Sequence, residues 1–185
     1  MKLESKLVQS MEENNVIEQD EIDVYRFGVQ LLSETVLSFV IFMIIAALFG
    51  SISEFIIFTV AFALLRQYAG GFHADKFISC LFVSCGIVTA FCIAIHIPDR
   101  SIYVIGTLAV ISLILILLLS PVDSKYKPVS DSEKRKYRKN LILFLVIEIA
   151  AAGIIVLYSI HFAMCIFFSW LVLAGLLFIG KIKNQ

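Results

Sequence analysis

The sequence lacks an excess of charge of either sign. Its 185 residues include 15 Lys or Arg and 15 Asp or Glu, so the formal net charge is zero. Nucleic-acid-binding domains usually carry a basic excess, and nothing here suggests a nucleic-acid partner. The first residues are charged and include no apolar core of the kind that signal peptides have, so we expect no cleavable signal.

Cysteine is scarce, and no two cysteines form a CxxC pair. The four cysteines are Cys80, Cys85, Cys92 and Cys165, and all lie in apolar segments. This pattern argues against a disulfide framework or a zinc site. A free cysteine in apolar surroundings usually packs as a small hydrophobe, and this is our interpretation of Cys85, Cys92 and Cys165.

Apolar residues, in contrast, make up 60% of the chain, whereas soluble domains are nearer to half. The runs are too long for a soluble core, so we predict an all-α polytopic membrane protein with about six transmembrane helices. The predicted spans are residues 29–49, 52–65, 77–97, 102–119, 141–160 and 162–179, with a tight turn near His161. The second run is short for a crossing of about 20 residues. It is therefore tilted or re-entrant, unless it extends to Tyr68.

The spans divide the chain into three parts. Residues 1–27 are polar, with apolar residues at helical spacing, which suits an amphipathic helix on the membrane surface or one packed on the protein's own loops. Residues 28–180 form a single transmembrane domain, and residues 181–185 form a tail. Within that domain, a reactive-looking stretch covers residues 66–80 and a basic loop covers residues 122–140.

The basic residues predict the orientation. The positive-inside rule places loop 122–140 in the cytoplasm. With six crossings, both termini and segment 66–76 fall on the same side, which leaves only Arg100 of the 15 basic residues outside. If the second run is re-entrant, the amino terminus moves outside, but segment 66–76 stays in the cytoplasm.

Two carboxylates lie inside predicted spans, where charge is costly. Glu34 either pairs with a basic residue such as Arg66 or sits at the interface. Glu148 is either a functional polar contact or is held protonated, and the sequence does not decide between these. His96 and His161 fall at the outer ends of their spans, which favours interfacial roles.

The stretch 66–80 brings together residues that suit nucleophilic catalysis. A cysteine becomes a nucleophile when a base or a positive field removes its proton, and His73 precedes Cys80 by seven residues. On a straight helix the two would lie about 10 Å apart, too far for the contact of about 3 Å that a general base needs. The helix must therefore begin after His73, with Gly70 and Gly71 allowing the chain to bend. Lys76 and the helix amino terminus would add a positive field.

Two further residues of this stretch have alternative roles. Arg66 would bind a substrate carboxylate or act as an ordinary cytoplasmic anchor, and Asp75 would orient His73 as the third member of a triad. From spacing alone, a membrane cysteine hydrolase or transferase is one interpretation. An inert Cys80 packed in a membrane helix is the other.

The pattern Arg66, Gly70-Gly71, His73-Ala74 and Cys80 resembles the accessory gene regulator protein B (AgrB) family. The layout is also similar, with a polar amino terminus, about six hydrophobic segments and a basic loop between the fourth and fifth. The resemblance covers essentially the whole chain. Its most specific part is the His-x6-Cys element within a Gly-rich loop that contains an arginine.

The resemblance implies a membrane cysteine endopeptidase of a Gram-positive bacterium, acting in quorum sensing. Cys80 would be the nucleophile and His73 its base, Gly71 would keep the loop shape, and Arg66 would support the substrate or the site geometry. The partner would be an AgrD-like amphipathic precursor peptide at the inner leaflet of the lipid bilayer. Its cleavage through a Cys80 thioester would lead to a thiolactone or lactone ring. No metal or organic cofactor is implied, and a homodimer is one candidate assembly.

Two other functions fit parts of the sequence. A peptide transporter or export component would make use of Glu34 and Glu148, but it would not need His73 and Cys80 together. An acyltransferase acting on lipid would share the thiol chemistry and would differ in substrate. The basic loop 122–140 serves as a topology determinant and, as a further hypothesis, attracts an acidic precursor tail.

Overall fold

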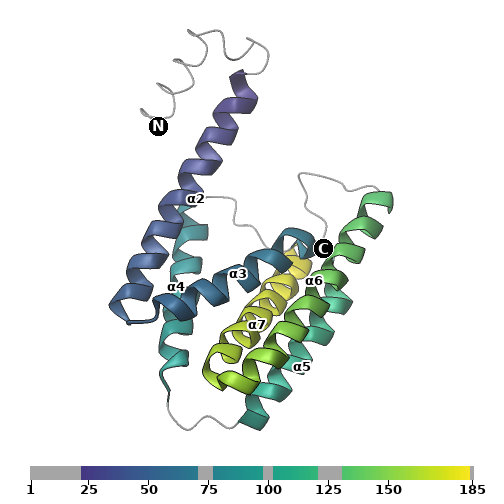
Figure 1. Cartoon of the computed structure of the whole chain (residues 1–185). Helices are drawn as coiled ribbons and strands as arrows, with labels where there is room; N and C mark the ends of the chain where they lie inside the picture. Colours follow the sequence, from purple (N-terminus) through teal and green to yellow (C-terminus); the bar gives the residue numbers. More distant parts are fainter. Residues whose placement is uncertain (1–21, 71–76, 98–101, 121–130, 184–185) are drawn as a thin grey trace. The chain divides into compact units, whose positions relative to one another are not determined.

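The regular elements of the protein are helices throughout the part of the chain that its structure, a computed structural model, describes. The described residues are 22–70, 77–97, 102–120 and 131–183. Figure 1 shows six helices over these ranges. They are α2 (Ile22–Leu48), α3 (Ile52–Ala69), α4 (Phe77–Ile95), α5 (Ile102–Leu119), α6 (Asp131–Tyr158) and α7 (Ile160–Lys183). The predicted all-α fold is confirmed, and the predicted amphipathic helix in residues 1–27 lies mostly outside the described residues.

Five of these helices, α2, α3, α4, α6 and α7, are long and apolar enough to cross a membrane. The sixth, α5, is also apolar, and its apolar stretch covers Tyr103–Leu119. The short second run of the sequence is part of α3, an 18-residue helix that continues past Tyr68 to Ala69. This extension gives α3 the length of a crossing. The helical set therefore agrees with an all-α polytopic membrane protein.

The chain divides into two compact units, Met1–Ile44 and Ile45–Gln185, and the second unit holds α3 to α7. Within it, α7 contacts α3, α4, α5 and α6. Half of the α7 span is buried (50%), against 28% for α3 and 22% for α4 and α6. Therefore α7 is the central helix of this unit. Its core consists of Ala61, Leu65, Ala69, Ala109, Ile116, Leu141, Leu145, Ala152, Ile166, Trp170, Leu173, Ala174 and Leu177.

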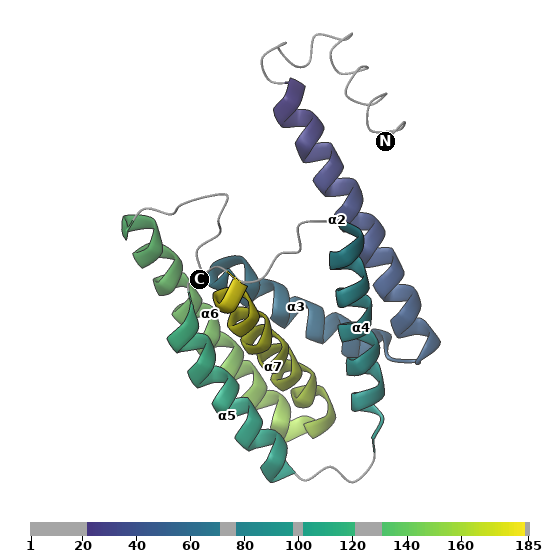
Figure 2. The same cartoon turned by 180° about the vertical axis from the view of Figure 1, so that it is seen from behind.

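Successive helices of the second unit alternate in direction (Figures 1 and 2). As a result, the carboxyl ends of α3 and α7 lie on the same side as the first turns of α6. These are the ends that carry Arg66, Lys181 and the basic residues of α6. The fold thus gathers on one side the segments that the positive-inside rule assigns to the cytoplasm.

The basic stretch 122–140 is not a loop over its whole length. Its second half belongs to α6, which begins at Asp131, ten residues before the predicted span at Leu141. The residues Glu133-Lys134-Arg135-Lys136 are good helix formers, so the helix extends beyond its apolar part. The basic side chains therefore stand on a helix rather than on an irregular segment.

A glycine separates α2 from α3. Gly50 has a φ of +67°, and its N–H donates to Ala47 O at 3.0 Å. The N–H of Ser51 donates to Ala46 O at 2.9 Å. These two bonds form a Schellman motif, which ends a helix with a left-handed residue that is usually glycine. At the other tight connection, α6 ends at Tyr158 and α7 begins at Ile160, so the predicted turn falls at Ser159 and His161 lies in the first turn of α7.

Glu148 makes a hydrogen bond inside the second unit. It is 5% exposed, and its Oε2 accepts a hydrogen bond from Trp170 Nε1 of α7 at 2.7 Å. Its Oε1 is buried without a partner among the described residues. This hydrogen bond is a polar contact that joins α6 to α7.

We expect Trp170→Phe to lower the free energy of unfolding by about 1 kcal/mol or more, because it leaves the buried Glu148 carboxyl without this donor. Adding Glu148→Leu should restore part of the loss, since both polar partners are then gone. The measurement is thermal unfolding in detergent, followed by circular dichroism. The contact contributes nothing if the loss in the double variant equals the sum of the losses in Trp170→Phe and Glu148→Leu alone.

Candidate active site

The carboxyl end of α3 is closed by Arg66 and Gly70. Arg66 Nη1 donates to Gly70 O at 2.6 Å, and the N–H of Gly70 donates to Arg66 O at 3.2 Å. Gly70 has φ 71° and ψ −147°, a conformation that is essentially restricted to glycine. The half-buried Arg66 side chain thus folds back on the end of its own helix. It holds the residue from which the chain leaves toward His73.

Cys80 lies in the first turns of α4, which begins at Phe77. It is a free thiol and is half-buried. Arg66 lies in the last turn of α3, which ends at Ala69, so seven residues separate the end of the helix that carries the cation from the start of the helix that carries the thiol.

The structure does not test the complete set of predicted site residues. It joins Arg66 to Gly70 and places Cys80 in the first turn of the next helix. His73, Gly71 and Asp75 lie outside the described residues. Their roles, and the distance between the imidazole and the thiol, stay predictions.

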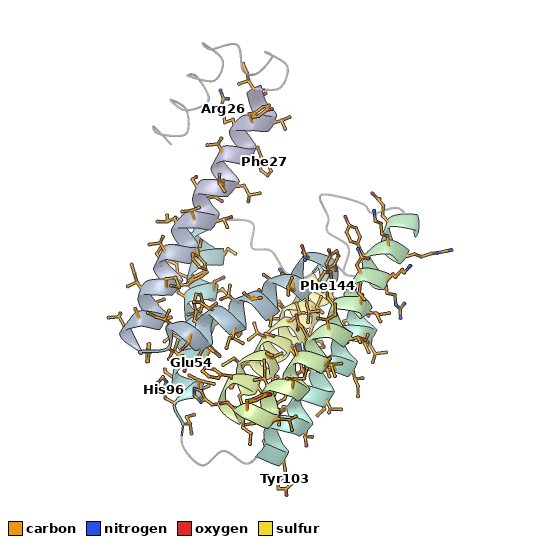
Figure 3. The ribbon with its side chains drawn as sticks, viewed as in Figure 1. Arg26, Phe27, Glu54, His96, Tyr103 and Phe144 are labelled. Carbon is orange, nitrogen blue, oxygen red and sulfur yellow. The ribbon has the colours of Figure 1, made fainter. Side chains whose placement is uncertain are left out.

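The other histidines lie far from this site. Figure 3 labels His96 and Glu54, at the ends of α4 and α3 opposite to Cys80 and Arg66. His96 Nδ1 is 2.8 Å from Cys92 O. His161 Nε2 is 3.0 Å from Glu54 Oε1, so it joins the amino ends of α7 and α3. Both imidazoles lie at helix ends, as predicted, and each has a local contact.

Glu34 and two of the other cysteines, which the sequence analysis also singled out, lie within helices and have local surroundings. Glu34 Oε1 accepts a hydrogen bond from Gln30 Nε2 at 2.9 Å within α2. Cys92 and Cys165 are buried, and Cys165 Sγ is 3.5 Å from His161 O. These two cysteines are placed as the packing residues that the sequence predicts.

An aromatic group beside the end of α3 was missed by the sequence analysis. The Tyr68 ring stacks on Phe144 of α6 with centroids 5.2 Å apart, and it lies 6.5 Å from the ring of Tyr137. Figure 3 shows Phe144 next to the carboxyl end of α3. Nothing in the spacing of these residues signals the contact, because Phe144 and Tyr68 belong to helices that are distant in sequence.

The chain is thus an all-α polytopic membrane protein with a cation and a thiol at one end of its helices. Residues 4–178 match the family model of accessory gene regulator B. An AgrB-like protein of Clostridium perfringens strain SM101 is 28% identical over 156 residues, which cover 77% of this chain and 71% of the relative. An AgrB-like protein of Listeria innocua serovar 6a is 31% identical over 115 residues, which cover 62% of this chain and 56% of the relative. No solved structure matches the chain.

The family match covers nearly the whole chain, so the protein belongs to the AgrB family. The resemblance drawn from the Arg66–Cys80 motif and the segment layout is confirmed.

Proposed function

We propose that this protein is a membrane cysteine endopeptidase that processes the precursor of an autoinducing peptide. Cys80 is the nucleophile and His73 is its general base. Membership of the AgrB family supports the general role. The observation that supports the mechanism is that only residues 70–76 separate the end of α3, which carries Arg66, from the start of α4, which carries Cys80.

The connection between the two helices limits where the base can be. Only residues 71–76 join Gly70 to Phe77, and His73 is the third residue after Gly70. An extended chain covers at most about 3.6 Å per residue, so the backbone of His73 lies within about 11 Å of Gly70. The length of this connection permits a contact between the His73 side chain and a thiol in the first turns of α4. Asp75, on the same connection, would orient its imidazole.

The reaction proceeds in two transfers of one acyl group. His73 takes the proton of Cys80, and Sγ attacks the carbonyl carbon at the carboxyl end of the future signal peptide. The carbon–nitrogen bond breaks, the imidazolium gives its proton to the leaving amine, and an acyl-thioester remains on Cys80. A cysteine thiol of the peptide then attacks the thioester carbonyl and closes a thiolactone, while Cys80 regains a proton. A peptide hydroxyl in that position would give a lactone.

The membrane boundary favours ring closure over hydrolysis. Exchange of one thioester for another is nearly isoenergetic, so water must be kept from the intermediate. Cys80 is half-buried at the end of an apolar helix, which limits its contact with water. An AgrD-like amphipathic precursor on the inner leaflet would reach this level by diffusion along the membrane. The exposed basic turns of α6 would attract an acidic tail.

The test uses the full chain in liposomes with a candidate precursor peptide. In wild type we expect a cleaved tail and a peptide adduct on Cys80, both detected by mass spectrometry. Cys80→Ala should give neither product, whereas Cys85→Ala is the matched control, because Cys85 is a second half-buried cysteine of α4. Cleavage by Cys80→Ala would refute the assignment of the nucleophile. Transport of the peptide without any cleavage would favour the export function instead.

A further inference from the structure

One side of α6 carries exposed cations ahead of the apolar part of the helix. Over residues 133–139 the chain has five basic residues and one acidic residue. Four of the basic side chains are exposed, and we call them the basic side of α6: Arg135, Lys136, Arg138 and Lys139. Within the part of the chain that the structure describes, no carboxylate forms an ion pair with any of the four. These cations repel one another, since like charges three or four residues apart on a helix are unfavourable, and a bound anion would relieve that repulsion.

The opposite side of α6 is packed in the core of the second unit. Leu141 and Leu145 are buried there against α3 and α7. Tyr137 lies one turn before Leu141, and its ring is 6.5 Å from the ring of Tyr68 on α3. This packing extends into the basic turns of α6 and fixes which side of them faces outward.

The basic side of α6 continues directly into exposed hydrocarbon. Arg138 and Lys139 are each followed four residues later by an apolar residue on the same side of the helix. These two residues are Ile142 and Leu143, with exposed fractions of 43% and 56%. Val146, 58% exposed, follows one turn after Ile142. Cations and an outward apolar surface therefore adjoin on one side of a helix that is apolar enough to cross a membrane.

The distances along α6 match the layers of a bilayer. Residues 141–158 span about 27 Å at the rise of a helix, close to the hydrocarbon thickness of about 30 Å. The four cations precede Leu141 by two to six residues, which is about 3–9 Å along the axis. The headgroup layer is about 5–8 Å thick on each side of the hydrocarbon. The basic side of α6 therefore falls at the level of the lipid phosphates.

We propose that the basic side of α6 binds the headgroups of anionic phospholipids. A phospholipid fits this surface better than a soluble acidic peptide, because it matches both the cations and the apolar side chains that adjoin them. The guanidinium groups of Arg135 and Arg138 pair with phosphate oxygens through their planar forks, and the two lysines add point charges. The inference is independent of the proposed cleavage reaction, since it involves none of residues 66–80.

The experiment uses the full chain in phosphatidylcholine liposomes with a small amount of a photoreactive lipid. The probe is phosphatidylglycerol with a diazirine near the top of one acyl chain, and the matched probe carries a phosphocholine headgroup instead. After illumination, the protein is cut with chymotrypsin, whose cleavage sites the variants below leave unchanged. Mass spectrometry measures the adducts over residues 140–150. In wild type we expect the anionic probe to give at least about fivefold more adduct than the matched probe.

Replacement of all four cations by glutamine should bring this ratio close to one. Arg138→Gln alone should lower it about two- to fivefold. Arg26→Gln is the matched control, because Arg26 is an exposed cation of α2 that already has a carboxylate partner, Asp23, at 3.3 Å. It should leave the ratio unchanged. Arg135→Lys combined with Arg138→Lys keeps the charge and should keep most of the preference.

The outcomes decide whether the surface binds lipid. A wild-type ratio near one would overturn the proposal, as would a raised ratio that survives in the fourfold glutamine variant. Should that variant fail to fold, wild type in about 1 M sodium chloride serves the same purpose, because the Debye length falls to about 3 Å; an unchanged ratio there would also overturn it. A ratio near one together with binding of soluble oligoglutamate, lost in Arg138→Gln, would assign the surface to an acidic peptide instead.

Discussion

Replacement of His73 by alanine is expected to slow precursor cleavage by about 10²- to 10⁴-fold, the contribution of a positioned general base. Without the imidazole, no group is in place to accept the proton of Cys80 or to donate a proton to the leaving amine. The assay follows release of the precursor tail from liposomes that contain the full chain. Added imidazole should recover part of the rate, because it replaces the missing proton carrier without altering the fold.

The two other histidines complete the control, since the chain has three in all. His96→Ala removes a contact with Cys92 O, and His161→Ala removes a partly exposed contact with Glu54 and a ring contact with Phe162. Such contacts are worth at most about 1 kcal/mol of stability, and neither lies near Cys80. Both variants should cleave within a few-fold of wild type. Unchanged cleavage in His73→Ala, or a loss of similar size in all three variants, would contradict the assignment of the base.

Much of the fold could be predicted because it follows from composition and charge. Long apolar runs require helices in a membrane, and the separation of Lys and Arg from those runs predicts which ends share a side. In the structure, the carboxyl ends of α3 and α7 lie on the same side as the first turns of α6. By sequence, these ends carry Arg66, Lys181 and the basic residues of α6. The predicted helix boundaries were less accurate. Arg66 and Gln67 suggest the end of an apolar run, yet buried Leu65 and Ala69 carry α3 to its glycine.

The contacts between helices could not be predicted. Glu148 was recognised as a carboxylate inside an apolar span and His161 as an interfacial residue, but their partners Trp170 and Glu54 lie 22 and 107 residues away. Such pairs depend on which helices pack together and in what register, and a nearly uniform apolar surface gives little sign of either. The stack of Tyr68 on Phe144 was missed for the same reason. The Arg66–Cys80 motif, in contrast, is local in sequence and was therefore recognisable.

Gly70→Ala is expected to reduce cleavage by about tenfold or more. Gly70 has φ 71° and ψ −147°, and a side chain in that region costs about 1–3 kcal/mol. The chain can relieve this strain only by rotating Gly70. Rotation moves the carbonyl that Arg66 Nη1 contacts at 2.6 Å and redirects the segment that leads to His73. The measurement is the cleavage rate per folded protein, with the folded fraction determined by circular dichroism.

Gly50→Ala is the matched control, because it puts the same methyl group on another glycine of positive φ, +67°, at the opposite end of α3. A Cβ at Gly50 would meet no atom within 4 Å, so its cost is also conformational, about 1–2 kcal/mol. Both variants should lower the melting temperature, but only Gly70→Ala should slow cleavage by the protein that remains folded. If the two lose the same activity per folded protein, the conformation of Gly70 serves stability alone. The geometry of the connection would then be fixed from the α4 side, through Cys80 and its neighbours.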